Sequence, residues 1–116
     1  MTSPLFKPLK IKSLNLPNRI VMAPMTRSKS PGGVPGEDVA DYYARRAAAD
    51  VGLIVTEGTT VKRGGASNDP NVPNFHRADS LAGWKNVVEK VHANKGLIAP
   101  QLWHQGMMRK PGTGPE

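Results

Sequence analysis

Side chains that can carry chemistry stand at the end of one apolar stretch of this sequence, LIAPQLWHQG at residues 97–106. A run of strand type passes through a proline and ends in an amide, an indole and an imidazole, those of Gln101, Trp103 and His104. Polar groups of this kind are uncommon in a strand that only fills a core. These three residues are therefore the first candidates for a functional site.

Two earlier apolar stretches end in the same way. RIVMAP, at residues 19–24, runs into Thr26 and Arg27, and VGLIVTEG, at residues 51–58, carries Glu57 near its end. The carboxyl ends of parallel strands meet at one edge of a sheet, where the following loops converge. Three polar strand ends therefore predict one shared site.

Some of these side chains also have a purely structural interpretation. Glu57 is interpreted as a carboxylate paired with an arginine rather than as a catalytic base, because buried carboxylates usually persist by pairing. His104 is interpreted as a hydrogen-bonded structural histidine, and His76 and His92 stand at no metal-ligand spacing from it. No metal site is predicted.

The segments between the strand ends predict two helices and a hairpin. Residues 5–17 hold two short alternating runs, which indicate a small hairpin or extended arm. Residues 37–50 and 80–94 show helical spacing; Asp79 or Ser80 can cap the second helix, and Gly96 can end it. The apolar stripes are Val39, Tyr43, Ala47 and Val51 in the first helix, and Leu81, Trp84, Val87, Val88 and Val91 in the second.

Taken together, these elements predict an α/β fold in the order β-α-β-α-β. The strands at 19–24, 51–58 and 97–103 are apolar nearly throughout, which is typical of parallel strands joined by right-handed crossovers. The loops after the first two strands are long, whereas the return loops are short. The loop PGGVPG lacks both G-x-G-x-x-G and the Lys-Ser/Thr ending of a phosphate loop, so a Rossmann site is the weaker alternative.

Composition excludes several classes of protein. The net charge is +7, but the 16 basic residues are scattered with at most two adjacent, so nucleic-acid binding is not predicted. The absence of cysteine excludes a disulfide framework, a thiolate zinc site and a cysteine nucleophile. Prolines and lysines interrupt the N-terminus where a signal peptide needs an apolar core, and no stretch is long enough to span a membrane. We therefore expect a cytoplasmic protein without a membrane partner.

Four segments carry a more specific signal. LFKPLKIKSLNLPNRIVMAPMTRSKS, DYYARRA, GLIVTEGTTV and GLIAPQLWHQG follow one another between Leu5 and Gly106. In order and spacing they resemble the old yellow enzyme family of FMN-dependent ene-reductases. The resemblance implies a (β/α)8 TIM barrel, of which residues 1–116 are the N-terminal portion. Residues 5–17 would be the hairpin that closes its bottom, and residues 19–116 would hold strands 1–3 with helices 1–2.

The resemblance also implies where the first strand meets FMN. The segment Ala23-Pro24-Met25-Thr26 would lie against the isoalloxazine ring, and Thr26 would also line the substrate site. A hydrogen bond from Thr26 to the flavin O4 would stabilise the electron-rich reduced ring and so tune its reduction potential. Other members of the family have cysteine at this position.

The second and third strands supply the remaining implied contacts. Gly58 would let the backbone approach the pyrimidine edge of the flavin, and the Gln101 amide, both donor and acceptor, would pair with that edge. Trp103 would line the substrate cavity. Glu57 and His104 would support the site rather than carry chemistry.

The activity implied by the resemblance is reduction of the activated C=C bond of α,β-unsaturated carbonyl or nitro compounds. NADH or NADPH would reduce FMN in the first half of a ping-pong cycle, and hydride would pass to the alkene in the second. In the family, the donor pair that polarises the substrate and the tyrosine that protonates it follow later strands. We therefore expect no catalytic residue in this chain and place these groups beyond Glu116.

A complete barrel typically needs about 250 residues, so the expected remainder lies in the same chain or in a partner chain. The family commonly continues QLWH-x-GR, whereas this sequence has Met107 in the place of that arginine and Arg109 two residues later. The alternative is a non-catalytic half-barrel remnant or binding module that needs a partner chain to complete it.

Overall fold

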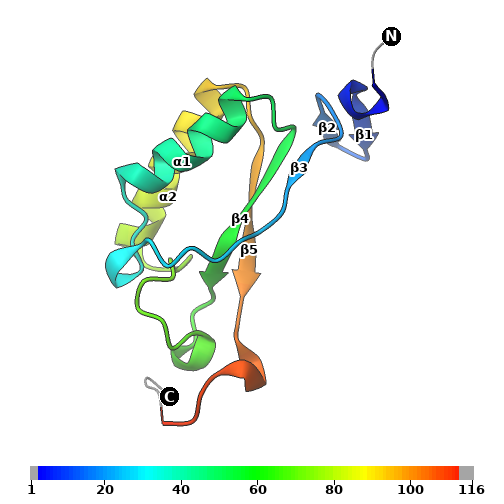
Figure 1. The fold of residues 1–116 in the computed structure, drawn as a ribbon. Helices are drawn as coiled ribbons and strands as arrows, with labels where there is room; N and C mark the ends of the chain where they lie inside the picture. The colour runs from blue at the N-terminus through cyan, green and yellow to red at the C-terminus, as the bar shows by residue number, and fades with distance from the viewer. Residues whose placement is uncertain (1–2, 113–116) are drawn as a thin grey trace.

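A parallel three-stranded sheet with both helices on one face forms the body of the protein. This computed structural model describes residues 3–112. Figure 1 shows a separate two-stranded hairpin at the end of the sheet where the strands begin. The elements are β1 (Leu9–Ile11), β2 (Leu14–Leu16), β3 (Val21–Met22), α1 (Glu37–Ala48), β4 (Leu53–Thr60), α2 (Ala78–Ala93) and β5 (Ile98–Trp103).

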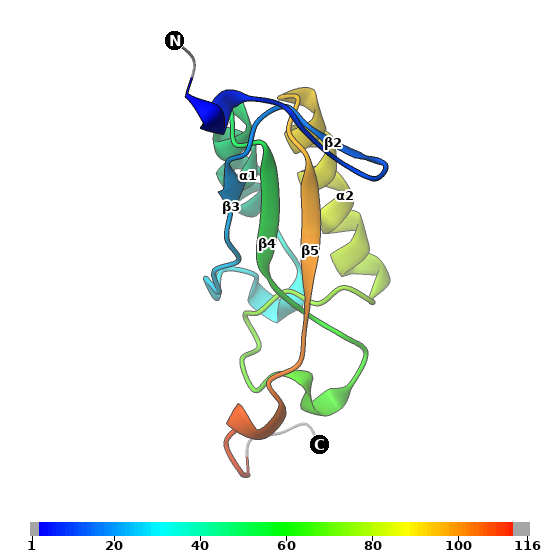
Figure 2. The same cartoon turned by 90° about the vertical axis from the view of Figure 1, so that its right-hand side faces the viewer.

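The strand order β3-β4-β5 follows the chain, and both strand pairs are parallel. Figure 2 shows β4 between its two neighbours, with α1 and α2 behind the sheet. Each helix connects one strand to the next, as expected for consecutive βα units. The predicted α/β order and the N-terminal hairpin are therefore confirmed, with β1 and β2 pairing antiparallel.

The hydrophobic core lies between the sheet and the two helices. Tyr43 and Trp84 are the largest side chains in it, and their rings lie 6.3 Å apart. Ile54 meets them from the sheet, flanked by the partly buried Met22 and Ile98. The helix residues in the core are Val39, Ala40, Tyr43, Ala47, Trp84, Val87 and Val91. The predicted stripes are confirmed except at Leu81, which is 42% exposed, and at Val88, which is only partly buried and lies outside the core cluster.

Two local predictions need correction. The first strand is shorter than residues 19–24, because its pairing with β4 ends at Met22 and Pro24 has no N–H to continue the ladder. Neither Asp79 nor Ser80 caps α2, which begins at Ala78. Instead, the side-chain oxygen of Asn74 accepts the N–H groups of residues 76 and 77 just before the helix.

A bulge in β4 changes which side chains reach each face of the sheet. Val55 pairs with Ala99, but the next pair is Gly58 with Gln101, so β4 has one residue more than β5 in this interval. Such an extra residue interrupts the regular alternation of side chains. Glu57, inside the bulge, is consequently buried on the helix side, where it contacts Tyr43 of α1.

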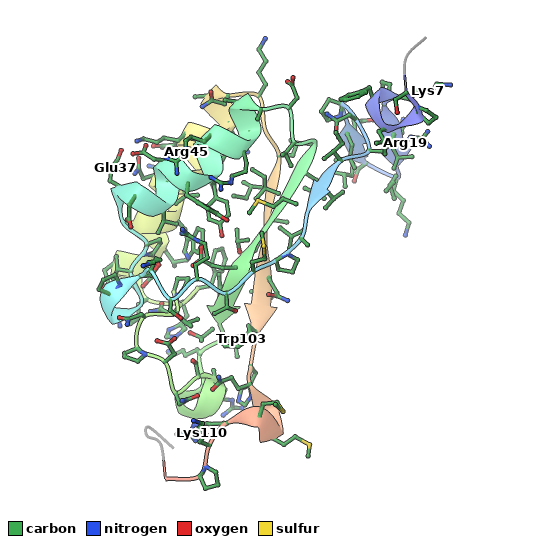
Figure 3. All side chains as sticks on the ribbon, in the orientation of Figure 1. Lys7, Arg19, Glu37, Arg45, Trp103 and Lys110 are labelled. Carbon is green, nitrogen blue, oxygen red and sulfur yellow. The ribbon has the colours of Figure 1, made fainter. Side chains whose placement is uncertain are left out.

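The hairpin and the carboxyl end of the sheet lie at opposite ends of the molecule. Figure 3 shows Lys7 and Arg19 beside the hairpin and Trp103 at the opposite, carboxyl end of the sheet. Within residues 3–112, no helix is long and apolar enough to cross a membrane.

Candidate functional site

The face of the sheet opposite the helices is covered by no other element within the described residues (Figure 1). Met22, Ile54 and Ile98 contact the helix-side core. Since side chains alternate along a strand, their neighbours Val21, Val55 and Ala99 belong to the other face. Val21 is 50% exposed, although it is a β-branched residue within a strand. This uncovered apolar face is called the open face below.

Three of the predicted site residues come together at the carboxyl end of the open face. Side chains alternate along β5, and Ile98 faces the helices, so Gln101 and Trp103, at odd spacing from Ile98, lie on the open face. The strand register places Gly58 directly beside Gln101. A Cβ added to Gly58 would lie 2.9 Å from Cδ2 of Trp103. The indole therefore rests on the bare backbone of β4, and this contact itself requires glycine.

Polar groups at this end of the open face have no partner among the described residues. The side-chain amide of Gln101 makes no hydrogen bond there; only its backbone does, through contacts with Thr56 and Thr59. The half-buried Trp103 likewise has no hydrogen bond from its indole N–H. An apolar surface that ends in an unpaired amide and indole is suited to a flat ligand with a polar edge.

The segment Ala23–Thr26 follows β3 to the same edge of the sheet. All four residues are exposed, with Met25 at 51%, and Pro24 makes the start of the segment stiff. The hydroxyl of Thr26 donates to no group in residues 3–112. The segment therefore presents apolar surface and one free hydroxyl beside the open face.

Glu57 belongs to a different part of the site. Its carboxylate oxygen Oε2 accepts hydrogen bonds from Arg27 Nε at 3.2 Å and from the Tyr43 hydroxyl at 2.6 Å, and the side chain is 1% exposed. The Glu57 backbone N–H in turn donates to the Tyr43 oxygen at 2.8 Å. The predicted pairing of Glu57 with an arginine is confirmed.

Burial raises the pKa of the Tyr43 phenol, and the adjacent Glu57 carboxylate raises it further. Tyr43 therefore stays protonated at ordinary pH and donates a hydrogen bond to Glu57 Oε2. Both hydrogen bonds that Glu57 Oε2 accepts come from within the protein, so this oxygen is arranged to hold neighbours in place rather than to take a proton from a substrate.

His104 follows β5 and is exposed. Its Nδ1 accepts the backbone N–H of Gly106 at 2.9 Å, which fixes the turn that starts there. The next residue, Gln105, bridges to the loop after β4 by accepting the N–H of Asn68 at 3.0 Å and by donating its own N–H to Ala66. His104 is thus hydrogen-bonded, as its structural interpretation predicted.

The loops after β3 and β4 also enclose an open cavity of about 470 Å³ next to this edge. Thr60, the last residue of β4, lines it, and Lys62 and Arg63 give it positive charge. Within residues 3–112, no group of histidine, aspartate or glutamate side chains could hold a metal ion.

Sequence reasoning missed two residues that complete the site. Tyr43 was assigned only to the apolar stripe of its helix, although the polar tip of a buried tyrosine usually finds a partner. Tyr42 was not singled out, yet the Arg27 guanidinium stacks on its ring at 3.8 Å. The sequence signal for both was the adjacent tyrosine pair itself, which stands in the predicted helix at residues 37–50, before the strand that carries the predicted buried carboxylate Glu57.

Comparison with known protein families yields one match over nearly the whole chain. The model of the NADH:flavin oxidoreductase / NADH oxidase family matches residues 4–112. The match includes all the strands, both helices and every candidate site residue named above.

Individual relatives agree with this match. The chain is 43% identical over 104 residues to 12-oxophytodienoate reductase 7 of Oryza sativa subsp. japonica, which covers 90% of this chain and 26% of that protein. It is 40% identical over 113 residues to the probable inactive reductase easA of Epichloe festucae var. lolii, covering 97% and 30%. The solved structure of morphinone reductase in complex with tetrahydroNAD superposes with a TM-score of 0.89 at 44% identity, covering 98% and 31%. The chain thus spans about a third or less of each relative.

Proposed function

Because the chain belongs to the NADH:flavin oxidoreductase / NADH oxidase family, which includes the old yellow enzymes, we propose that it is part of a cytoplasmic FMN-dependent ene-reductase. The substrates are α,β-unsaturated carbonyl or nitro compounds, and NADH or NADPH is the reductant. The family fold is a (β/α)8 TIM barrel, and the hairpin with three βα-ordered strands described above corresponds to its first part. The remainder of the barrel is supplied by the same chain or a partner chain.

One observation supports the proposal most: the unpaired Gln101 amide lies on an uncovered apolar sheet face, at the edge to which Ala23–Thr26 also lead. These residues fit FMN, whose ring is flat and whose pyrimidine edge carries both donors and acceptors. Gln101 would pair with that edge, and Thr26 would donate a hydrogen bond to O4. The exposed residues Ala23, Pro24 and Met25 would contact the ring.

Gly58 has a double role in this proposal. Its lack of a side chain leaves room for the Trp103 indole, which the structure places against it, and keeps the backbone of β4 accessible beside Gln101. Trp103 would line the substrate site, while Glu57 holds the Arg27 side chain and His104 holds the backbone N–H of Gly106.

Bound FMN would supply the redox chemistry, taking hydride from NADH or NADPH and giving it to the alkene in a ping-pong cycle. The residues of this chain would bind and orient the ring: they would present donors to it and exclude water from one side of it. The groups that polarise the substrate and protonate it are assigned to the part of the barrel beyond this chain, since the chain corresponds to about 30% of its relatives.

The experiment is to purify the protein that contains this chain and record its absorption spectrum. We expect bound FMN, bleaching of the flavin band by NADH or NADPH, and recovery on addition of 2-cyclohexenone. Gln101→Leu should weaken FMN binding severalfold, whereas Asn86→Leu, which removes an exposed amide from α2, should not. A protein without flavin, or equal FMN affinity in both variants, would contradict the proposal.

The second candidate is a non-catalytic half-barrel that needs a partner chain. It is favoured by the 40% identity to a relative described as a probable inactive reductase. A preparation verified as complete that binds neither FMN nor substrate, yet associates with a barrel-completing chain, would favour this candidate.

A further inference from the structure

Arg27 directly follows Thr26 and is held on two sides. Its Nε donates to Glu57 Oε2 at 3.2 Å, and its guanidinium lies on the Tyr42 ring at 3.8 Å. The side chain is only 18% exposed. A planar guanidinium that is both stacked and hydrogen-bonded has one allowed orientation, which a lysine cannot reproduce.

The partners of Arg27 are themselves held by further contacts. Glu57 sits in the bulge of β4 with 1% of its side chain exposed, and Tyr43 grips it through two hydrogen bonds. Tyr42 meets Tyr43 edge-on with ring centroids 5.1 Å apart. The loop after β3 is thereby tied to both β4 and α1.

The residue after Arg27 is fixed as well. Ser28 has a φ of +54°, a left-handed conformation that a non-glycine residue adopts only at a cost. Its hydroxyl donates to Asp69 Oδ2 at 2.5 Å, and Oδ1 of Asp69 accepts the N–H of Asn71. The loop after β4 therefore holds Ser28 in this conformation, and the backbone next to Thr26 has little freedom.

The Arg27–Glu57 pair is poorly arranged for stability alone. Nη2 of Arg27 and Oε1 of Glu57 are both buried and have no hydrogen-bond partner within the described residues. A two-pronged contact between the groups would have satisfied both atoms. Buried ion pairs with unsatisfied atoms stabilise little relative to apolar residues of the same size, so fixing a geometry is the better account of this one.

We propose that Arg27 is a positioning residue: clamped by Glu57 and Tyr42, it sets the backbone at Thr26 and thereby the hydrogen bond from Thr26 to FMN. This inference rests on the proposed function, because it needs FMN beside Thr26. It assigns to the clamp an influence on the flavin reduction potential, although Arg27 itself contacts no reacting atom.

The test measures the midpoint potential of FMN in the flavin-loaded protein. Thr26→Ala should lower it, since loss of a donor destabilises the electron-rich reduced ring. Arg27→Lys should lower it by at least half as much. In the double variant the shift should equal that of Thr26→Ala alone, because Arg27 acts through Thr26.

Arg46→Lys is the matched control. Arg46 stacks on the same Tyr42 ring at 3.7 Å and donates to the Tyr42 carbonyl, but none of its contacts involves Glu57 or residues 26–28. This variant should leave the potential unchanged. If Arg27→Lys does not fold, Tyr43→Phe replaces it, since it removes the hydroxyl that holds Glu57 and leaves the arginine in place.

The outcomes separate the inference from the function on which it rests. A wild-type protein without FMN contradicts the proposed function. With FMN bound, three results would overturn the inference alone: no shift in Thr26→Ala, a shift in Arg27→Lys no larger than in Arg46→Lys, or additive shifts in the double variant. Loss of thermal stability in Arg27→Lys with an unchanged potential would likewise show that the clamp is only structural.

Discussion

The two faces of the same sheet differ in almost every physical respect. On the helix side, Ile54 is fully buried among the aromatic and valine side chains of α1 and α2. On the open face, Val21 from the neighbouring strand is half exposed, and the carboxyl end carries the unpaired amide of Gln101. The helix side is therefore fully packed, whereas the open face has apolar residues typical of a protein interior but no element packed against it within the described residues.

The difference shows that the two faces have different roles, one in stability and the other in ligand binding. The helix side provides the stability, because apolar burial scales with the area removed from water. The open face provides the candidate ligand surface, where exposed apolar and polar groups are useful. The Arg27–Glu57–Tyr43 contacts connect them, since Tyr43 belongs to the core and Arg27 adjoins Thr26.

The largest expected effect tests the two faces directly. Ile54→Ala should destabilise the protein by about 2–5 kcal/mol, through lost burial and the cavity it leaves. Val21→Ala, on the adjacent strand but the open face, should change the stability of the 116-residue chain by only about 0.5 kcal/mol. Urea unfolding of both variants measures this. Equal losses would mean that the open face is packed after all.

The same pair sharpens the barrel proposal. In a protein that completes the barrel, Val21 becomes an interior residue, so Val21→Ala should then cost more than in the 116-residue chain. An unchanged cost would contradict burial of the open face by later strands.

An intermediate effect is expected at Gly58, where the open face does carry a packed contact. The Cβ in Gly58→Ala would lie 2.9 Å from the Trp103 ring, and overpacking of this kind typically costs about 1–3 kcal/mol. The displaced indole should also shift its fluorescence to longer wavelength. Gly65→Ala is the control, because its Cβ would lie at an ordinary 3.4 Å from Arg109. Equal behaviour of the two variants would show that Trp103 does not rest on β4.

The smallest effect is expected on the outer surface of the helices. Lys90 of α2 forms ion pairs with Glu37 and Asp41 of α1, but these groups are exposed and screened by salt. Lys90→Met should lower the stability less than Gly58→Ala does, and high salt should remove the difference from wild type. Lys85→Met, which breaks a pair of 3.9 Å within α2, is the control and should have still less effect.

This contribution should also depend on pH. Hydrogen bonds from Lys90 and Asn86 lower the pKa of Glu37 from its usual 4.5. A lowered pKa in the folded state stabilises the protein above the unfolded value and is lost as the pH falls toward the folded value. The stability difference between wild type and Lys90→Met should therefore shrink below about pH 4.5. A difference that grows on acidification would contradict the assignment.

The periodicity of the sequence was enough to predict the layers of the fold. Helical spacing identified both stripes, and apolar runs identified three strands, because burial of one helix face or two sheet faces leaves a direct record in residue type. The exceptions in α2 have the right spacing but stay outside the core: Leu81 is 42% exposed and Val88 is only partly buried.

The candidate site was predicted in its members but not in its arrangement. Gln101 and Trp103 were recognised as unusual strand ends, and the structure places both on the open face. The bulge that turns Glu57 to the helix side leaves no pattern in the sequence, because it depends on how β4 pairs with β5. The contact of Gly58 with Trp103 was missed for the same reason, since it joins residues 45 positions apart.

The sequence by itself thus determined the order of elements, most core-facing positions and the family, because these follow from local spacing and from segments that resemble a family. Only the tertiary structure decided which polar side chains of the site have hydrogen-bond partners within the described residues and which do not. The Oε2 oxygen of Glu57 accepts hydrogen bonds from Arg27 and Tyr43, while the Gln101 amide stays unpaired within residues 3–112. That distinction depends on distances between residues remote in the chain, and no local pattern encodes them.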